Sequence, residues 1–106
     1  AQLNHWEKEG DNYEAEFKMN NQEFEAEFTS DGEWVKTENK LLGASIPENV
    51  MESFNRSEYK NSKIIEKEVV ETPEHKLLYE IEVVKDGKEY GLYFTPGGEL
   101  VMIEED

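Results

Sequence analysis

One stretch of the chain occurs twice, and this duplication constrains the fold more than any other feature. Residues 13–35 (YEAEFKMNNQEFEAEFTSDGEWV) align with residues 79–101 (YEIEVVKDGKEYGLYFTPGGELV) without a gap, at an offset of 66 positions (79 minus 13), and nine of the 23 positions are identical. A gapless internal match indicates two copies of one structural unit. We therefore expect both stretches to fold alike.

Each copy has the pattern of a β-hairpin, because apolar and polar residues alternate on both sides of a two-residue turn signal. The turns are Asn20-Asn21 and Asp86-Gly87, whose residues tolerate the positive φ of hairpin turns. A two-residue turn fixes which residues lie opposite each other. The predicted apolar pairs are Phe17 with Phe24, Ala15 with Ala26, Tyr13 with Phe28, Val83 with Tyr90, Ile81 with Leu92, and Tyr79 with Phe94. A slip of one residue would expose the whole set, so this face is the predicted core.

The opposite face of the predicted sheet carries glutamates. The same register sets Glu14 against Glu27 and Glu16 against Glu25, although like charges in such pairs destabilise a sheet by roughly 0.2–1 kcal/mol each. We therefore expect this outer, solvent-facing side to carry the function. The candidate partner-binding residues are Glu14, Glu16, Glu25, Glu27, Glu80, Glu82, Glu89 and Tyr93.

Between the two copies the apolar period changes from two to about 3.6, with Ile46, Val50 and Phe54 on one side. This predicts one helix over about 46–59, packed on the apolar face of the sheet. Ser45 and Glu48 fit a capping box at its start. The predicted fold class is α+β, an antiparallel sheet of two tandem four-stranded units with this one helix and without a helix in the first unit.

Length and charge limit the organisation and the partners. The 106 residues suffice for a single domain (1–106), with a first repeat of strands only (1–43) and a second of one helix and four strands (44–106). The net charge of −15 disfavours nucleic acid and anionic membrane surfaces. No apolar run approaches the roughly 20 residues of a membrane span, and the given chain shows no signal peptide. We expect no nucleic-acid binding and no membrane insertion.

The order and duplication of these pieces resemble the PepSY-like family, small extracytoplasmic bacterial domains related to the beta-lactamase inhibitor protein. The matching pieces are Ile46-Pro47-Glu48, Ser62 to Glu66, Tyr79 to Val83, Asp86-Gly87-Lys88, Leu92-Tyr93-Phe94 and Gly98-Glu99-Leu100. Lys60 departs from the pattern, because the family usually has a proline there. The resemblance implies tandem units of a helix and a four-stranded sheet, a periplasmic or secreted location, and a binding or inhibitory role of the sheet surface. It supplies no catalytic residues.

The residues themselves give no sign of catalysis or of a cofactor. The chain has no cysteine, which excludes thiol catalysis. The two histidines, His5 and His75, fall at non-equivalent places in the repeat and match no ligand spacing, so no metal site is predicted from them. Paired carboxylates on a sheet face lack the cleft that acid–base catalysis needs. We expect a protein that is not an enzyme and holds no cofactor.

Three interpretations of Glu14, Glu16, Glu25 and Glu27 remain open from sequence. They form a solvated face that keeps the sheet soluble, a docking surface for a basic protein or cell-envelope partner, or a weak calcium site. A structural or accessory module of a cell-envelope protein is the alternative to a binding domain. The sequence also predicts that Trp34 is buried and that Tyr93 is exposed.

Overall fold

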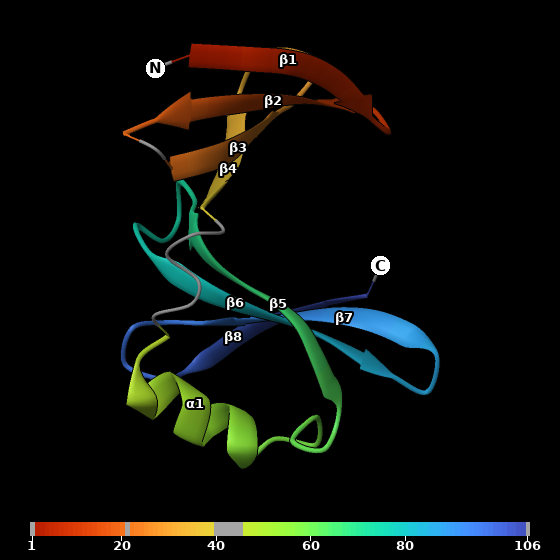
Figure 1. Ribbon diagram of the computed structural model, residues 1–106, viewed down its shortest axis with the longest axis vertical. Helices are drawn as coiled ribbons and strands as arrows, with labels where there is room; N and C mark the ends of the chain where they lie inside the picture. Colours follow the sequence, from red (N-terminus) through yellow and green to blue (C-terminus); the bar gives the residue numbers. More distant parts are fainter. Residues whose placement is uncertain (1, 21, 40–45, 106) are drawn as a thin grey trace.

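The computed structural model describes residues 2–20, 22–39 and 46–105. These residues form one antiparallel sheet of eight strands in the order of the chain, with one helix between the fourth and fifth strands (Figure 1). The α+β prediction is confirmed. The elements are β1 (Gln2–Glu9), β2 (Asn12–Met19), β3 (Gln22–Phe28), β4 (Trp34–Asn39), α1 (Glu48–Asn55), β5 (Lys63–Glu71), β6 (Leu78–Lys85), β7 (Lys88–Phe94) and β8 (Leu100–Glu105).

Both hairpins have the predicted registers. In the β2–β3 hairpin Tyr13 pairs with Phe28, and in the β6–β7 hairpin Tyr79 pairs with Phe94, with every pair between them as expected. Asn20 and Asp86 adopt positive φ angles of 53° and 52°. A two-residue turn therefore sets the register in each case. Asn21 lies outside the described residues.

The helix is shorter than the predicted span of 46–59. It ends at Asn55, because the Arg56 N–H already binds both the Glu52 and the Ser53 carbonyl groups and the chain then continues in tight turns. Pro47 occupies the N-cap position without a side-chain hydrogen bond. The predicted capping box cannot be compared, since Ser45 lies outside the described residues.

The main core lies between α1 and one face of β6 and β7. Figure 1 shows α1 lying along one side of these strands. Val50 and Phe54 of the helix pack against apolar side chains of the sheet. The sheet residues of this cluster that are fully buried are Ile81, Val83, Leu92 and Phe94. Tyr59 joins them from the turn after the helix. The second hairpin thus buries the face that its alternation predicted.

The equivalent face of β1–β4 is apolar but only partly covered. Phe17 and Phe24 stack with ring centroids 5.3 Å apart, whereas 55% of Trp6 is exposed. Trp34 lies on this apolar face of the sheet, where its Nε1–H donates a hydrogen bond to Thr37 Oγ1 at 2.9 Å. The prediction that Trp34 is buried was wrong. It is 37% exposed, because α1 packs against β6 and β7 and leaves this end of the sheet open.

The two four-stranded parts join edge to edge. Within the described residues, β4 pairs with β5 through Thr37 with Glu71, Glu38 with Val70 and Asn39 with Val69. Figure 1 shows the sheet bending at this junction, so that β1–β3 lie over the face of β6–β8 that is turned away from α1. This bend turns the glutamate face into the concave side of the sheet.

Candidate functional site

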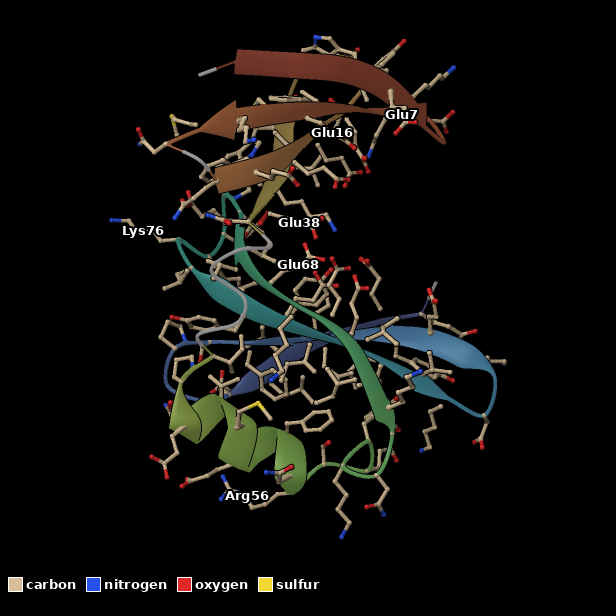
Figure 2. All side chains as sticks on the ribbon, in the orientation of Figure 1. Glu7, Glu16, Glu38, Arg56, Glu68 and Lys76 are labelled. Atoms are coloured by element: carbon tan, nitrogen blue, oxygen red, sulfur yellow. The ribbon has the colours of Figure 1, made fainter. Side chains whose placement is uncertain are left out.

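A hollow of about 550 Å³ lies on the concave side, between the two four-stranded parts. Seven of the twelve described residues that line it are glutamates. The lining residues are Glu14, Glu27, Val35, Lys36, Glu38, Thr72, Glu74, Glu80, Glu82, Tyr93, Met102 and Glu104. We refer to it as the acidic hollow. Figure 2 shows carboxylate oxygens gathered in this region, with Glu38 and Glu68 near its centre.

Strand pairing explains why these residues meet. Residues directly opposite each other in an antiparallel sheet project from the same face. One row crosses the first part of the sheet as Glu7, Glu14, Glu27 and Lys36. Another crosses the second part as Glu68, Glu80, Tyr93 and Met102. The bend brings the two rows to the same hollow.

The structure brings five of the eight predicted site residues to the acidic hollow. They are Glu14, Glu27, Glu80, Glu82 and Tyr93. Glu16 and Glu25 are half-buried opposite each other on the same face but do not line it. Glu89 is exposed near the start of β7, away from the hollow.

The expected exposure of Tyr93 was wrong, since only 1% of it is accessible, and only 3% of Glu80. The bend covers this face with the first part of the sheet, and the Tyr93 ring packs on Val70 and Leu78. Its hydroxyl accepts a long hydrogen bond from Lys36 Nζ and donates one to Glu104 Oε1, each 3.5 Å. Burial and the Glu80 carboxyl raise the pKa of Tyr93 above its usual range, so the phenol stays neutral.

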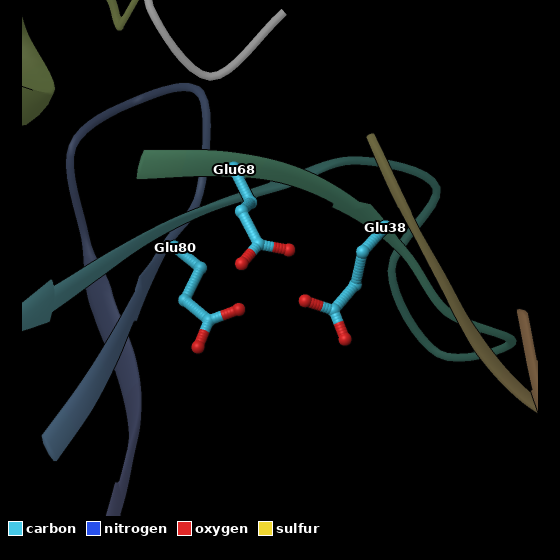
Figure 3. A group of neighbouring side chains, drawn as sticks. All are labelled: Glu38, Glu68 and Glu80. Carbon is cyan, nitrogen blue, oxygen red and sulfur yellow. The ribbon is translucent and has the colours of Figure 1, made fainter. Parts of the chain in front are cut away.

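Sequence reasoning missed two central residues, Glu38 and Glu68. Figure 3 shows the side chains of Glu38, Glu68 and Glu80 pointing toward one another from β4, β5 and β6. Their closest carboxylate oxygens all lie within 4.8 Å of one another, and only 2% of Glu68 is accessible. We call these three residues the carboxylate triad. The signal that could have revealed Glu68 is its alternation with Glu66 in β5, which continues the glutamate face across from Glu80 and Glu82.

The pKa values of the three triad carboxyl groups differ from one another, because the groups are buried close together. Burial, a hydrogen bond to Glu38 and the negative charge of Glu38 raise the pKa of Glu68 to about 11. Burial and the Glu38 charge likewise raise the pKa of Glu80 to about 9. Burial alone would also raise the pKa of Glu38, but the hydrogen bond from Glu68 and the charge of Lys36 lower it. At neutral pH a protonated Glu68 therefore donates to an ionised Glu38.

Lys36 supplies a positive charge inside the hollow. Its Nζ lies 3.3 Å from Glu38 Oε1 and 5.8 Å from the centre of the Tyr93 ring. Burial would lower the pKa of Lys36, but the surrounding carboxylates, Glu38 first among them, raise it above the usual value. Lys36 therefore stays charged and offsets part of the negative charge of the hollow.

Gly91 leaves the space that Glu80 occupies. A Cβ atom at Gly91 would lie 2.6 Å from Glu80 Oε2, closer than real contacts allow. Any other residue at this position of β7 would force the Glu80 carboxyl to move. Glycine at this position therefore leaves room for the Glu80 carboxyl at its buried position.

Two other expectations from the sequence concern the histidines and membrane insertion. His75 is exposed in the turn between β5 and β6, where its backbone N–H donates to Thr72 Oγ1 at 2.9 Å. Within the described ranges, no helix has the length and apolar character that crossing a bilayer requires.

Solved structures with the same fold come from several Bacteroides species. A BLIP-like protein from Bacteroides fragilis is 27% identical, with a TM-score of 0.74 over 99% of this chain and 74% of its own. A DUF2874 family protein from Bacteroides ovatus is 26% identical, with a TM-score of 0.72 over 97% of this chain and 74% of its own. A protein from Bacteroides eggerthii, described as "putative periplasmic", is 28% identical, with a TM-score of 0.72 over 99% of this chain and 77% of its own.

The family assignment rests on a match over most of the chain. No curated protein matches it. The profile of the family described as "Putative beta-lactamase-inhibitor-like, PepSY-like" matches residues 11–102. These residues include both hairpins, α1 and every described lining residue of the acidic hollow except Glu104. The chain therefore belongs to the PepSY-like family.

Proposed function

We propose that this protein is a non-catalytic extracytoplasmic binding domain that docks a basic protein segment in the acidic hollow. The observation that carries the proposal is the hollow itself, about 550 Å³ in volume and lined by seven glutamates. Complementary charge would raise the association rate and select the partner. In this proposal the chain acts as one domain, and its two repeats (1–43 and 44–106) each supply one wall.

The position of the hollow also supports binding. It lies on the side of the sheet opposite α1, so a partner could enter without disturbing the main core. A Lys or Arg side chain would find several carboxylates within reach, which matches the preference of these cations for charge-assisted hydrogen bonds. The BLIP-like neighbour supports a binding role for this fold, and inhibition is one form that such binding could take.

The carboxyl groups with raised pKa values do not favour catalysis. A general acid or base must contact the group whose proton it transfers. Glu68 is almost fully buried and does not line the hollow, and Glu80 exposes only 3% of its surface. Their raised pKa values are the result of burial within a sheet. We therefore propose that this protein is not an enzyme.

We also propose a periplasmic or secreted location for this protein. The neighbour from Bacteroides eggerthii is described as "putative periplasmic". A strongly acidic chain with a net charge of −15 is also suited to basic partners in the cell envelope. Fractionation of native cells with an antibody against the chain tests the location, and recovery in the cytoplasmic fraction would refute it.

Photocross-linking in native cells tests the docking site. A photoreactive residue at Met102, on the lining of the hollow, should form an adduct with the partner. The same residue at Arg56, exposed at the end of α1, should not. Equal adducts from both positions, or an adduct from Arg56 alone, would overturn the proposal.

A charge-matched comparison tests the role of the carboxylates. Replacing Glu14, Glu27 and Glu104 together by Gln removes three charges from the hollow. Replacing the exposed Glu33, Glu52 and Glu58 by Gln removes three charges elsewhere. The first variant should lose most of the Met102 adduct and the second should keep it. An equal loss of adduct in both variants would show that net charge, and not the hollow, governs binding, and undiminished adducts in both would show that these carboxylates have no role.

The partly covered apolar face of β1–β3 favours a second candidate, an accessory module that packs against a neighbouring polypeptide. Trp6 packs on Phe28 with ring centroids 5.9 Å apart and is more than half exposed, and Tyr13 beside them is also exposed. Aromatic side chains of this kind often anchor interfaces. Adducts from a photoreactive residue at Trp6, with none at Met102, would favour this candidate over docking in the hollow.

A further inference from the structure

Two buried carboxylate oxygens in the triad have no hydrogen-bond partner among the residues that the structure describes. They are Glu68 Oε2 and Glu80 Oε1, which belong to side chains that are at least 97% buried. A buried polar atom without a partner costs about 1–3 kcal/mol, and more if it is charged. Both atoms belong to the group of side chains that converge in Figure 3. Two such atoms in one cluster indicate a partner that the described side chains do not supply.

The spacing of the triad suits a single cation. One oxygen from each of Glu38, Glu68 and Glu80 lies within 4.8 Å of the others. Oxygen ligands of calcium lie at about 2.3–2.6 Å from the ion, so two ligands of one ion can be up to about 5 Å apart. Three carboxylates on three adjacent strands therefore need little movement to share an ion.

We propose that Glu38, Glu68 and Glu80 form a calcium site at the floor of the acidic hollow. The site goes beyond the proposed docking function, because it uses a buried triad and requires no protein partner. It also differs from the weak calcium site considered from sequence, which used Glu14, Glu16, Glu25 and Glu27.

A second set of carboxylates overlaps the first. Glu66, Glu68 and Glu82 also bring one oxygen each within 4.8 Å. Both sets use Glu68, which sits between them on β5. Both orphaned oxygens belong to the first set, and this favours Glu38, Glu68 and Glu80 as the primary ligands.

The ligand chemistry favours calcium over other metals. The triad offers oxygen atoms only, which suits calcium, magnesium or manganese and disfavours zinc or copper. Calcium accepts six to eight ligands in a flexible geometry and can take carboxylates in bidentate mode, whereas magnesium needs a nearly ideal octahedron. The acidic hollow opens beside Glu38 and Glu80, so water can complete the coordination.

The protons that the triad holds without metal support the same conclusion. The pKa values of Glu68 and Glu80 are raised because burial and the Glu38 charge oppose further ionisation. A bound divalent cation would supply the positive charge that lets these groups ionise. Gly91 keeps the space in which the Glu80 carboxyl adjusts.

Calorimetric titration of the metal-stripped protein with calcium chloride tests the site. We expect one calcium ion bound per chain, and a melting temperature that rises by on the order of 10 °C at a hundredfold excess over Kd. Magnesium at the same concentration and ionic strength should produce a clearly smaller rise. Absence of binding, or an equal effect of both ions, would overturn the proposal.

Matched variants separate the triad from general charge in the hollow. Glu68→Gln removes one triad ligand with little change of shape, and Glu104→Gln removes one charge from the lining of the same hollow. Calcium binding should weaken at least tenfold in Glu68→Gln and change less than threefold in Glu104→Gln. Glu80→Gln provides a second triad variant and should behave as Glu68→Gln does. Equal weakening in all three variants would show diffuse attraction and refute the triad.

Terbium luminescence gives a readout that depends on position. Terbium(III) replaces calcium in oxygen sites and is excited by energy transfer from nearby aromatic rings. Tyr93 borders Glu80 and lines the hollow. Wild-type protein should sensitise terbium, calcium should displace it, and Glu68→Gln should lose the signal. A signal of equal strength in Glu68→Gln would contradict the proposed site.

Discussion

Replacing Glu68 by Gln should stabilise this protein at neutral pH, although Glu68 is among its most buried residues. In the metal-free native state the pKa of Glu68 is raised from 4.5 to about 11, so it keeps its proton at pH 7, whereas the unfolded chain loses it. Holding that proton costs about 1.4 kcal/mol per pH unit above 4.5, or about 3 kcal/mol at pH 7. Glutamine carries no such cost.

The sign of the pH dependence follows from the direction of the shift. A carboxyl whose pKa is raised by folding contributes its full stability below the unfolded value of 4.5 and loses that contribution as the pH rises toward its folded value. Glu80, with a folded pKa of about 9, acts in the same direction. Wild-type protein in chelator should therefore become more stable as the pH falls from 8 to 5.

The assay is urea unfolding, followed by circular dichroism in chelator, at pH 5, 6, 7 and 8. We expect Glu68→Gln to exceed the wild type by about 2–3 kcal/mol at pH 7, and the difference to shrink to below about 1 kcal/mol at pH 5. The Gln amide can also replace the carboxyl proton as donor to Glu38.

Two results would refute this reasoning. Glu68→Gln could be less stable than the wild type at pH 7, which would mean that Glu68 is ionised and favourably bound in the native state. The difference could also be independent of pH, which would mean that no proton is retained on folding. Glu104→Gln, a matched change at an exposed residue of the hollow, should alter the pH dependence little.

Three further substitutions test the packing and the hollow. Phe54→Ala should destabilise the fold by about 3–5 kcal/mol in urea unfolding, because Phe54 anchors α1 to the core, and a loss below 1 kcal/mol would contradict that role. Gly91→Ala should lower the free energy of unfolding by about 1–3 kcal/mol, because the new Cβ would meet Glu80. The loss should be largely absent in a Glu80→Ala background, and equal losses in both backgrounds would exclude this clash. Lys36→Met should cost about 1–3 kcal/mol at pH 7, because Glu38 loses its ion pair. The loss should shrink as the pH falls below 4.5 and Glu38 becomes protonated, and a loss independent of pH would assign the effect to packing.

The local parts of the fold could be predicted from the sequence. Alternation around Asn20-Asn21 and Asp86-Gly87 fixed both hairpin registers, since a two-residue turn allows only one pairing. The change of the apolar period after the first repeat located the helix. The same pattern did not show that Tyr59 reaches the core from a turn after the helix.

The concave shape could not be predicted, because it depends on contacts between distant parts of the chain. Alternation assigns Glu80 and Tyr93 to a face, but it does not say what lies opposite that face. The bend at the short β4–β5 pairing decides their burial. Glu38 reaches Glu68 through the β4–β5 pairing, and Glu80 lies opposite Glu68 through the longer β5–β6 turn, for which no two-residue rule fixes the register. Alternation could thus assign Glu68 to the glutamate face, but the sequence alone did not show that the three carboxylates meet.

The central claim is that partners bind on the concave glutamate face. The most direct test is to titrate the partner recovered by cross-linking into isotope-labelled protein and to map the backbone amide shifts by NMR. We predict the largest shifts at Glu14, Glu27, Met102 and Glu104, with α1 unaffected. Shifts confined to α1, or to Trp6 and Tyr13 on the opposite face, would contradict it.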